Sequence, residues 1–359
     1  MKSNFPNKLI KTFKHKRVLV TGHTGFKGAW MVQILLNLDC KILGISKKIE
    51  TRPSLFNILN HKKKINHKLV DLAKNYKLAK KTIIKFNPHV IFHFAAQSLV
   101  LTGYNNQYKT FNNNILSTLN ILEISKEIKS LKSFIHISSD KVYSQKKQSN
   151  KSEKDELDAV DPYSISKVNC ELIFKSYKKE YFLKKKIGAV SLRAGNVIGG
   201  GDWSNDRLIP DFIKSLKKKR MFLRSPNSIR PWQHVLDCLF GYLLVSINLL
   251  NHPKKISGYW NVGPKKSNLS VHKITLLAKK KFRLDINILK TKNKFKETKY
   301  LFLDSRKIKR RLGYKPLLSP NKVIDFTVAW YLSFLKNKKK LIELTNYQIN
   351  YFLKNLDYK

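Results

Sequence analysis

The sequence predicts an α/β fold built on a doubly wound parallel sheet, with a smaller C-terminal lobe. Two observations carry this prediction. Short apolar runs alternate with helical patterns through the first half of the 359 residues, which is typical of successive βαβ units. A glycine-rich turn at residues 21–28 joins the first apolar run to the first helical pattern. After about residue 195, three consecutive glycines and several prolines interrupt the pattern, and this predicts a lobe built from insertions.

Six strands and several helices are predicted in order along the chain. The strands cover residues 17–20, 41–46, 68–71, 89–94, 134–138 and 187–193. Helical patterns cover residues 29–36, 78–86 and 115–128, and a late helix contains Trp330 and Tyr331. We therefore expect a nucleotide-binding domain at residues 16–194, a second lobe with segments that return to the sheet at 195–335, and a basic C-terminal tail at 336–359.

The turn between the first strand and the first helix has the spacing of a dinucleotide-phosphate cradle. Gly22 permits the tight turn, Gly25 allows the backbone to approach a pyrophosphate, and Gly28 allows close packing of helix and strand. The free N–H groups and the positive dipole at the helix start favour an anion there. A glycine-rich turn in another context often only reverses the chain, so the prediction of a phosphate cradle depends on the strand before the turn and the helix after it. The candidate cofactor contacts are Gly22, Thr24, Gly25, Phe26, Lys27 and Gly28.

A second constellation indicates hydride chemistry at a carbinol. Tyr163 and Lys167 are four residues apart and so share one helix face, and Ser139 follows the fifth predicted strand. A nearby ammonium favours the phenolate of a tyrosine. A phenolate can take a hydroxyl proton while the carbon gives a hydride to a nicotinamide cofactor. The alternative for Tyr163 and Lys167 alone is a solvated helix face.

These motifs resemble the extended short-chain dehydrogenase/reductase family, over residues 16–331. The resemblance is carried by residues 21–28, 94–97, 139–141, 193–203, 207–211 and 229–235. It is closest to the nucleotide-sugar 4,6-dehydratases, and the last three segments favour these over the epimerases. The resemblance implies a Rossmann fold, NAD as cofactor, CDP-glucose as substrate and a homodimer.

The resemblance also implies a role for each candidate catalytic residue. Tyr163 is the base for the 4-hydroxyl of the sugar, and Lys167 supports Tyr163 and the nicotinamide ribose. Ser139 hydrogen-bonds the 4-oxygen, and Asp140 protonates the leaving 6-oxygen. Lys141 stands where many related dehydratases have Glu. It acts either as the base at C5 or as a cation that stabilises the enolate.

Further cofactor contacts follow from the same resemblance. Asp71, at the end of the third predicted strand, contacts the adenine edge, and the alternative is a strand-end turn residue. Ala95, Ala96 and Gln97 line the cofactor after the fourth strand, or serve only for packing. The second strand ends in Lys47 instead of the carboxylate that binds the ribose in NAD enzymes. That position therefore does not decide between NAD and NADP.

The substrate diphosphate requires cations or hydrogen-bond donors. Arg230 and Asn196 are the first candidates and Arg207 is a weaker one, because the planar guanidinium binds phosphate through two donors. Arg193 ends a strand, so a structural role is its alternative. Leu101 stands where the resemblance leads us to expect Arg.

The formal net charge of +49 is spread along the whole chain. We interpret it as compositional bias with solvated lysine faces, so no specific nucleic-acid partner is predicted, and non-specific polyanion binding stays open. A catalytically inactive polyanion-binding protein is the alternative class. Cys40, Cys170 and Cys238 have neither disulfide nor metal spacing, so we expect no metal and a cytoplasmic location. The apolar run at 239–250 is too short to span a membrane.

Overall fold

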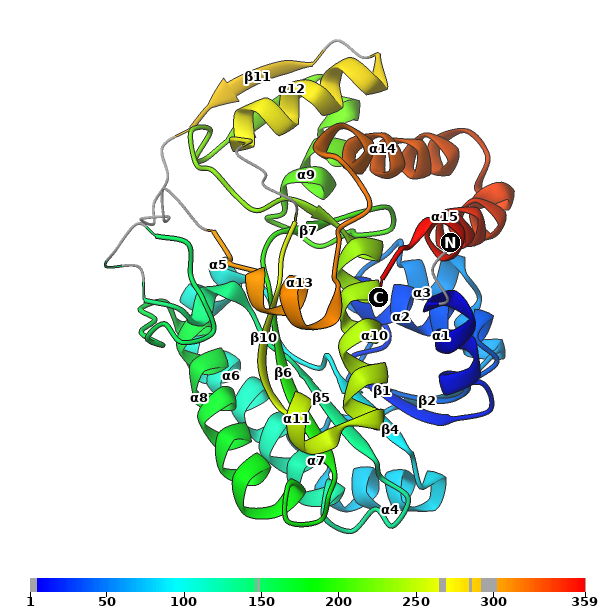
Figure 1. Ribbon diagram of the computed structural model, residues 1–359. Helices are drawn as coiled ribbons and strands as arrows, with labels where there is room; N and C mark the ends of the chain where they lie inside the picture. The colour runs from blue at the N-terminus through cyan, green and yellow to red at the C-terminus, as the bar shows by residue number, and fades with distance from the viewer. Residues whose placement is uncertain are drawn as a thin grey trace.

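The computed structural model describes residues 5–144, 146, 149–264, 269–283, 286–291 and 302–358. Its centre is a seven-stranded parallel sheet in the order β10-β6-β5-β4-β1-β2-β3 (Figure 1). The strands of this sheet are β1 (Arg17–Thr21), β2 (Lys41–Ser46), β3 (Asn66–Leu69), β4 (Val90–His93), β5 (Ser133–Ile137), β6 (Gly188–Ala194) and β10 (Gly258–Val262). The doubly wound fold class predicted from the sequence is therefore confirmed.

Helices cover both faces of the sheet, so its strands are buried on both sides except for the edge strand β3, which is largely exposed. Val18 and Val20 of β1 belong to the core under α2 and α10, whereas Leu19 belongs to the core under α4, α7 and α8. This alternation follows from the two-residue period of a strand. The helices of these layers are α1 (Phe5–Phe13), α2 (Phe26–Asn37), α3 (Leu55–Ile58), α4 (Tyr76–Phe86), α5 (Val100–Asn105), α6 (Gln107–Phe111), α7 (Ser117–Ser125), α8 (Pro162–Tyr177), α10 (Val235–Asn251) and α11 (Pro253–Ile256).

The predicted strands agree with the structure except at two places. The third strand was expected at 68–71, but β3 ends at Leu69 and Asp71 lies beyond it. Strand β3 lies at the edge of the sheet and pairs there with β2. Because β2 ends at Ser46, which is paired with Leu69, the ladder stops at that residue. The sequence analysis also gave no position for β10, which pairs with β6 at the edge of the sheet.

The smaller lobe lies at the carboxyl ends of the strands, at the top of Figure 1. It contains two short strand pairs, β7 with β9 and β8 with β11, together with α9, α12 and α14. Their bounds are β7 (Val197–Ile198), β8 (Arg220–Leu223), β9 (Gln233–His234), β11 (Asn287–Lys290), α9 (Leu208–Ser215), α12 (Val271–Phe282), α13 (Arg306–Leu312) and α14 (Pro320–Lys336). The predicted late helix with Trp330 and Tyr331 is α14.

The segment 336–359, described above as a basic tail, contains helix α15 (Leu341–Asn355). Leu341, Ile349 and Phe352 recur on one helical face and are fully buried in the main core. Four of the six lysines of this segment, at 336 and 338–340, precede the helix. Among the described residues, no helix has the length and apolarity required to cross a membrane.

Candidate active site

A cavity of about 840 Å³ opens at the carboxyl ends of the sheet. The strand order reverses between β1 and β4, and in open α/β sheets this is where ligands bind. The glycine turn, Asp71, Ser139 to Lys141, Tyr163 and residues 203–211 and 221–225 all line this cavity. Except for Arg193, every candidate site residue named from the sequence lines this cavity, so the tertiary structure brings the others together.

The glycine turn fits a dinucleotide pyrophosphate. Gly22 has φ +72°, and a Cβ there would lie 2.8 Å from Ala95 N. A Cβ at Gly28 would overlap the carbonyl oxygen of Gly22. Gly25 is the N-cap of α2 and offers no side-chain hydrogen bond. The first N–H groups of α2 therefore lack a side-chain cap beside the cavity, which suits an anion.

Replacing Gly28 with alanine is expected to destabilise the protein by about 1–3 kcal/mol, because the added methyl group displaces the Gly22 carbonyl. NAD affinity should fall with it. Gly25→Ala is the matched comparison, since its Cβ would lie 3.3 Å from Gly22 O, a distance that requires only a small adjustment. We expect Gly25→Ala to lower NAD affinity with less loss of stability. Thermal unfolding and calorimetric titration with NAD measure both quantities, and an unchanged unfolding temperature for Gly28→Ala would contradict this account.

An ion pair just after the end of β2 lines the cavity. Lys47 Nζ lies 2.9 Å from Asp71 Oδ2, and Asp71 Oδ1 accepts the backbone N–H of Ala73 at 3.0 Å. Asp71 therefore also serves as the turn residue that the sequence analysis gave as its alternative. The sequence analysis missed the pairing with Lys47, because 24 positions separate the two residues and only the β2–β3 register brings them together.

Side-chain hydrogen bonds fix the loop after β4. Gln97 Nε2 donates to Leu99 O at 2.9 Å and to Thr110 Oγ1 at 3.0 Å, so this amide shapes the loop. Gln97 N donates to Asn114 Oδ1 at 2.7 Å, and Asn114 Nδ2 donates to Ser166 Oγ on α8 at 2.8 Å. The sequence analysis missed Asn114. Its available signal was a run of three asparagines, which form the π-helical turn Asn112–Leu116, a feature often found at functional sites.

Helix α8 places Tyr163 and Lys167 at the cavity. The helix begins after Asp161, whose Oδ1 accepts the N–H of Ser164 at 3.0 Å, with Pro162 in its first turn. Lys167 Nζ donates to Ile137 O at 2.7 Å, and burial lowers the pKa of Lys167. Both side chains are buried.

The sequence analysis expected a nearby ammonium to favour the phenolate of Tyr163, and in the structure the net effect is the opposite. Burial raises the pKa of Tyr163 to about 12, although the Ser139 hydroxyl and the charge of Arg207 act to lower it. Desolvation of the phenolate therefore outweighs its polar surroundings. Tyr163 carries its proton at neutral pH in this structure.

Ser139, Asp140 and Lys141 form the start of a 3₁₀ turn after β5. Ser139 Oγ accepts the N–H of Lys141 at 3.2 Å and donates to Asp140 Oδ1 at 3.1 Å. Asp140 Oδ2 is buried without a hydrogen-bond partner among the described residues. It lies next to Gly195, where a Cβ would be 2.8 Å away. Burial raises the pKa of Asp140, against the charges of Lys141 and Arg230, so this carboxyl is suited to hold a proton.

Positively charged side chains also line the cavity. Arg207 Nη2 donates to Ser98 Oγ at 3.1 Å, and Arg207 Nε lies 3.9 Å from Asp202 Oδ2. Arg230 is buried, and its Nη1 donates to Ile229 O at 3.0 Å. Burial lowers the pKa of Lys27, which also lines the cavity. Ser98 and Asp202 were not named as site residues from the sequence, although Asp202 lies in the segment 193–203 that carries the resemblance.

Arg193 does not line the cavity. Its guanidinium is 2% exposed and forms an ion pair with Glu171, which is fully buried. The structural alternative for Arg193 therefore holds.

The fold and the site define a class of enzyme. A doubly wound sheet, a glycine turn that fits NAD, and a Ser–Tyr–Lys set with an adjacent buried acid belong to the extended short-chain dehydrogenase/reductases that act on nucleotide sugars. A family model described as GDP-mannose 4,6 dehydratase matches residues 19–327, and the chain belongs to this family of NAD-dependent 4,6-dehydratases.

Individual relatives include both dehydratases and epimerases. The chain is 34% identical over 338 residues to the CDP-glucose 4,6-dehydratase of Salmonella typhimurium, covering 91% of this chain and 93% of the relative. It is 26% identical to a UDP-glucose 4-epimerase of Mycoplasma pneumoniae, covering 89% and 97% of the two chains. Among solved structures, a dTDP-glucose 4,6-dehydratase from Streptomyces venezuelae with NAD bound has a TM-score of 0.76 and 22% identity, covering 91% and 99%. At that identity the structural likeness shows the fold alone.

Proposed function

We propose that this protein converts CDP-D-glucose to CDP-4-dehydro-6-deoxy-D-glucose and water, with NAD as a recycled cofactor. One observation carries the reaction type: the Asp140–Lys141 pair adjoins the same cavity as Tyr163 and Lys167. An epimerase needs no acid and base for elimination, whereas a dehydratase does. The 34% identity to the Salmonella enzyme supports CDP-glucose as the substrate.

The chemistry that bound NAD would supply is hydride acceptance from C4 of the sugar and hydride return to C6. The residues of the chain move the protons of the oxidation. Tyr163 Oη takes the proton of the 4-hydroxyl while Ser139 Oγ hydrogen-bonds the same oxygen. Lys167, held by the Ile137 carbonyl, would hydrogen-bond the nicotinamide ribose. The glycine turn and the N-terminus of α2 would hold the pyrophosphate, and Asp71 would contact the adenine edge.

Oxidation at C4 makes the C5 proton acidic and so permits elimination. Asp140 gives a proton to the 6-oxygen, which leaves as water while the C5 proton is removed. Lys141 is either the base for that proton or a cation that stabilises the enolate; both roles stay open. C5 regains a proton when the hydride returns to C6. The proton taken by Tyr163 replaces, through solvent, the one given by Asp140, so the net change is the loss of one water.

The substrate diphosphate is held by Arg207 and Arg230, with Asn196 as a neutral donor. These three residues line the same cavity as Tyr163 and the glycine turn. Leu101 also lines the cavity, so the Arg expected there from the family is missing. Arg207 and Arg230 are therefore the guanidiniums that we assign to the diphosphate.

The test is to incubate the purified protein with NAD and, in parallel, CDP-glucose and the UDP-, GDP- and dTDP-hexoses, following the product mass. Loss of one water from CDP-glucose alone, without net NADH, is the expected result. Dehydration of another sugar would retain the reaction and change the substrate. An altered stereocentre without mass change would identify an epimerase, which the Mycoplasma relative makes the second candidate. No change in any sugar would contradict the proposed function.

We also propose a homodimer located in the cytoplasm. Leu116 on the π-helical turn and Leu172 on α8 are 37% and 53% exposed, and a second copy of the chain would bury such side chains. Sedimentation velocity is expected to show twice the chain mass. All three cysteines are free and buried, which supports a reducing compartment.

A further inference from the structure

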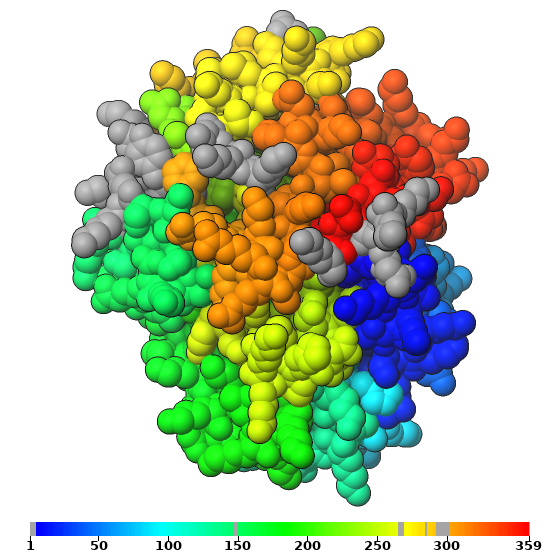
Figure 2. Space-filling view, in the orientation of Figure 1, coloured from blue at the N-terminus to red at the C-terminus, as the bar shows by residue number. Residues whose placement is uncertain are grey.

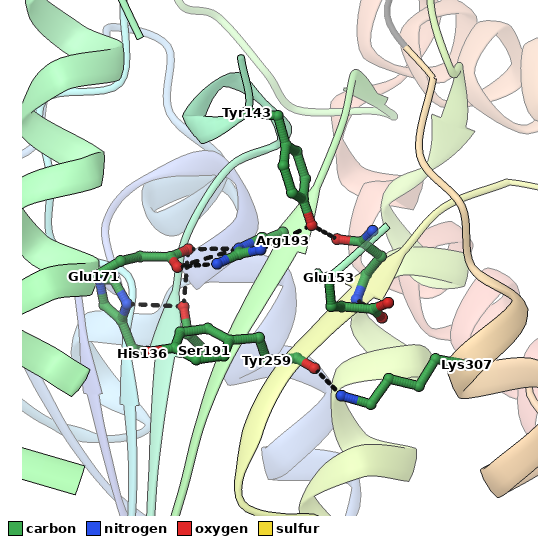
Figure 3. Close-up of polar contacts among 9 residues, drawn as sticks. His136, Tyr143, Glu153, Glu171, Ser191, Arg193, Tyr259 and Lys307 are labelled. Atoms are coloured by element: carbon green, nitrogen blue, oxygen red, sulfur yellow. Dashed lines mark hydrogen bonds and ion pairs between the residues drawn. The ribbon is translucent and has the colours of Figure 1, made fainter. Parts of the chain in front are cut away.

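A buried polar network includes Tyr143, which follows Asp140 and Lys141 in the chain (Figure 3). At its centre, Arg193 on β6 pairs with Glu171 on α8, and Arg193 Nε lies 2.9 Å from Glu171 Oε1. Ser191 Oγ donates to Glu171 Oε1 at 3.2 Å, and His136 Nδ1 lies 3.1 Å from the same hydroxyl. Together, the ion pair and these hydrogen bonds join three elements of the fold: β5, β6 and α8.

Tyr143 links this ion pair to the edge of the sheet. Its hydroxyl accepts from Arg193 Nη1 at 2.9 Å and donates to Asn261 Oδ1 on β10 at 2.6 Å. Its ring lies under the guanidinium, 4.8 Å from the Arg193 Cζ atom, a distance typical of cation–π contacts. The Tyr143 side chain is fully buried, so both hydrogen bonds are shielded from water.

Asn261 in turn anchors the segments that cover this side of the sheet. Its Nδ2 donates to Lys151 O at 2.8 Å and to Asp304 O at 3.2 Å, and its backbone N–H donates to Glu153 Oε1 at 2.8 Å. The α13 region, orange in the centre of Figure 2, packs over β10. The Tyr143 hydroxyl is therefore held between two fixed partners, one on each side.

The residues of this network lie close in the chain to the candidate catalytic residues. Glu171 is one helical turn beyond Lys167 and two turns beyond Tyr163 on α8, so it shares their helix face. Tyr143 is two residues beyond Lys141 and ends the 3₁₀ turn that contains Asp140. The network thus connects the helix that carries the oxidation residues with the turn that carries the elimination residues.

We propose that Tyr143 is a positioning residue for elimination: its hydroxyl, held by Arg193 and Asn261, sets the turn 139–143 so that Asp140 and Lys141 face the sugar bound against Tyr163. This inference rests on the proposed dehydratase function. Asp140 Oδ1 accepts from Ser139 of the same turn, and its Oδ2 has no hydrogen-bond partner among the described residues, so the place of this carboxyl depends on the backbone of the turn. Tyr163 and Lys167 are placed by α8, with Lys167 also held by the Ile137 carbonyl on β5.

The test separates the two steps of the reaction. In Tyr143→Phe, mixing enzyme, NAD and the nucleotide hexose that the wild-type protein dehydrates should give oxidation that is slowed much less than water loss, because Ser139 is the one proposed oxidation residue on the turn and lies at its far end from Tyr143. Water loss should fall about 10- to 100-fold, since small misplacements of reacting groups have effects of this size. Enzyme-bound reduced nicotinamide should therefore accumulate, seen by its absorbance. Lys141→Ala provides the reference for blocked elimination and should show the same accumulation.

A second measurement does not depend on turnover. Hydrogen–deuterium exchange of peptides that cover residues 139–144 should be faster in Tyr143→Phe than in the wild-type protein. Tyr314→Phe is the matched control, because it removes a buried hydroxyl that donates to Asp237 O at 3.3 Å and does not line the cavity. This control should change neither the exchange of that peptide nor the ratio of the two steps.

Equal loss of oxidation and water loss in Tyr143→Phe would show a purely structural role and overturn the inference. Wild-type rates for both steps would overturn it as well. Failure of the proposed function would appear in the wild-type protein, as absence of dehydration with every nucleotide hexose, whereas failure of this inference appears only in the comparison of variants.

Discussion

Tyr163→Phe is expected to slow oxidation of the sugar about 10²- to 10⁴-fold, the contribution typical of a positioned base. The ring remains and only the atom that takes the 4-hydroxyl proton is lost. Overall dehydration should fall by the same factor, because elimination requires the C4 ketone. No reduced nicotinamide should accumulate in this variant, in contrast to Tyr143→Phe and Lys141→Ala. Single-turnover absorbance measurements separate these cases.

The pH dependence of the same step provides an independent check. Because burial raises the pKa of Tyr163 to about 12, the deprotonated base is scarce at neutral pH and its fraction rises with pH. The oxidation rate of the wild-type protein should therefore increase from neutral to moderately alkaline pH. Tyr163→Phe should lose this increase. A variant that keeps both the rate and its pH dependence would exclude Tyr163 as the base.

Arg193→Met is expected to destabilise the protein by about 3–5 kcal/mol, the effect of leaving one charge of a buried pair without its partner. Glu171 is fully buried, and in the variant Ser191 Oγ alone among the described residues would still donate to its carboxylate. Tyr143 would at the same time lose the donor to its hydroxyl. Chemical denaturation monitored by tryptophan fluorescence measures the shift in unfolding midpoint.

Two comparisons make this prediction specific to the buried charge. Glu171→Gln combined with Arg193→Met removes the unpaired carboxylate, so the double variant should be less destabilised than the sum of the two single variants. Lys184→Met breaks an exposed pair with Glu180 and should change stability by less than about 1 kcal/mol. If Arg193→Met were no more destabilising than Lys184→Met, the buried pair would not contribute to folding as argued.

Much of the fold followed from local patterns. The second strand was predicted at 41–46 and is observed as Lys41–Ser46, because its run of apolar residues is buried between two helical layers. The glycine turn was recognised because each glycine meets a steric demand of its immediate surroundings, as Gly22 and Gly28 show. The pairing of Tyr163 with Lys167 followed from helical periodicity alone.

Other features depended on elements far apart in sequence. Strand β10 was not located because its partner β6 is about 70 residues earlier and no local signal records that pairing. Helix α15 was not predicted, because no sequence motif marks it and its apolar face is recognisable only once the helix is packed against the core.

Patterns within single elements were enough to predict the doubly wound fold and the cofactor turn, and helical spacing together with the family resemblance supplied the candidate catalytic residues. The pairing of Lys47 with Asp71, the burial of Arg193 against Glu171 and the raised pKa of Tyr163 are visible only in the three-dimensional structure. The reason is physical: hydrogen-bond partners and desolvation are set by neighbours in space, and a local sequence pattern contains no information about those neighbours.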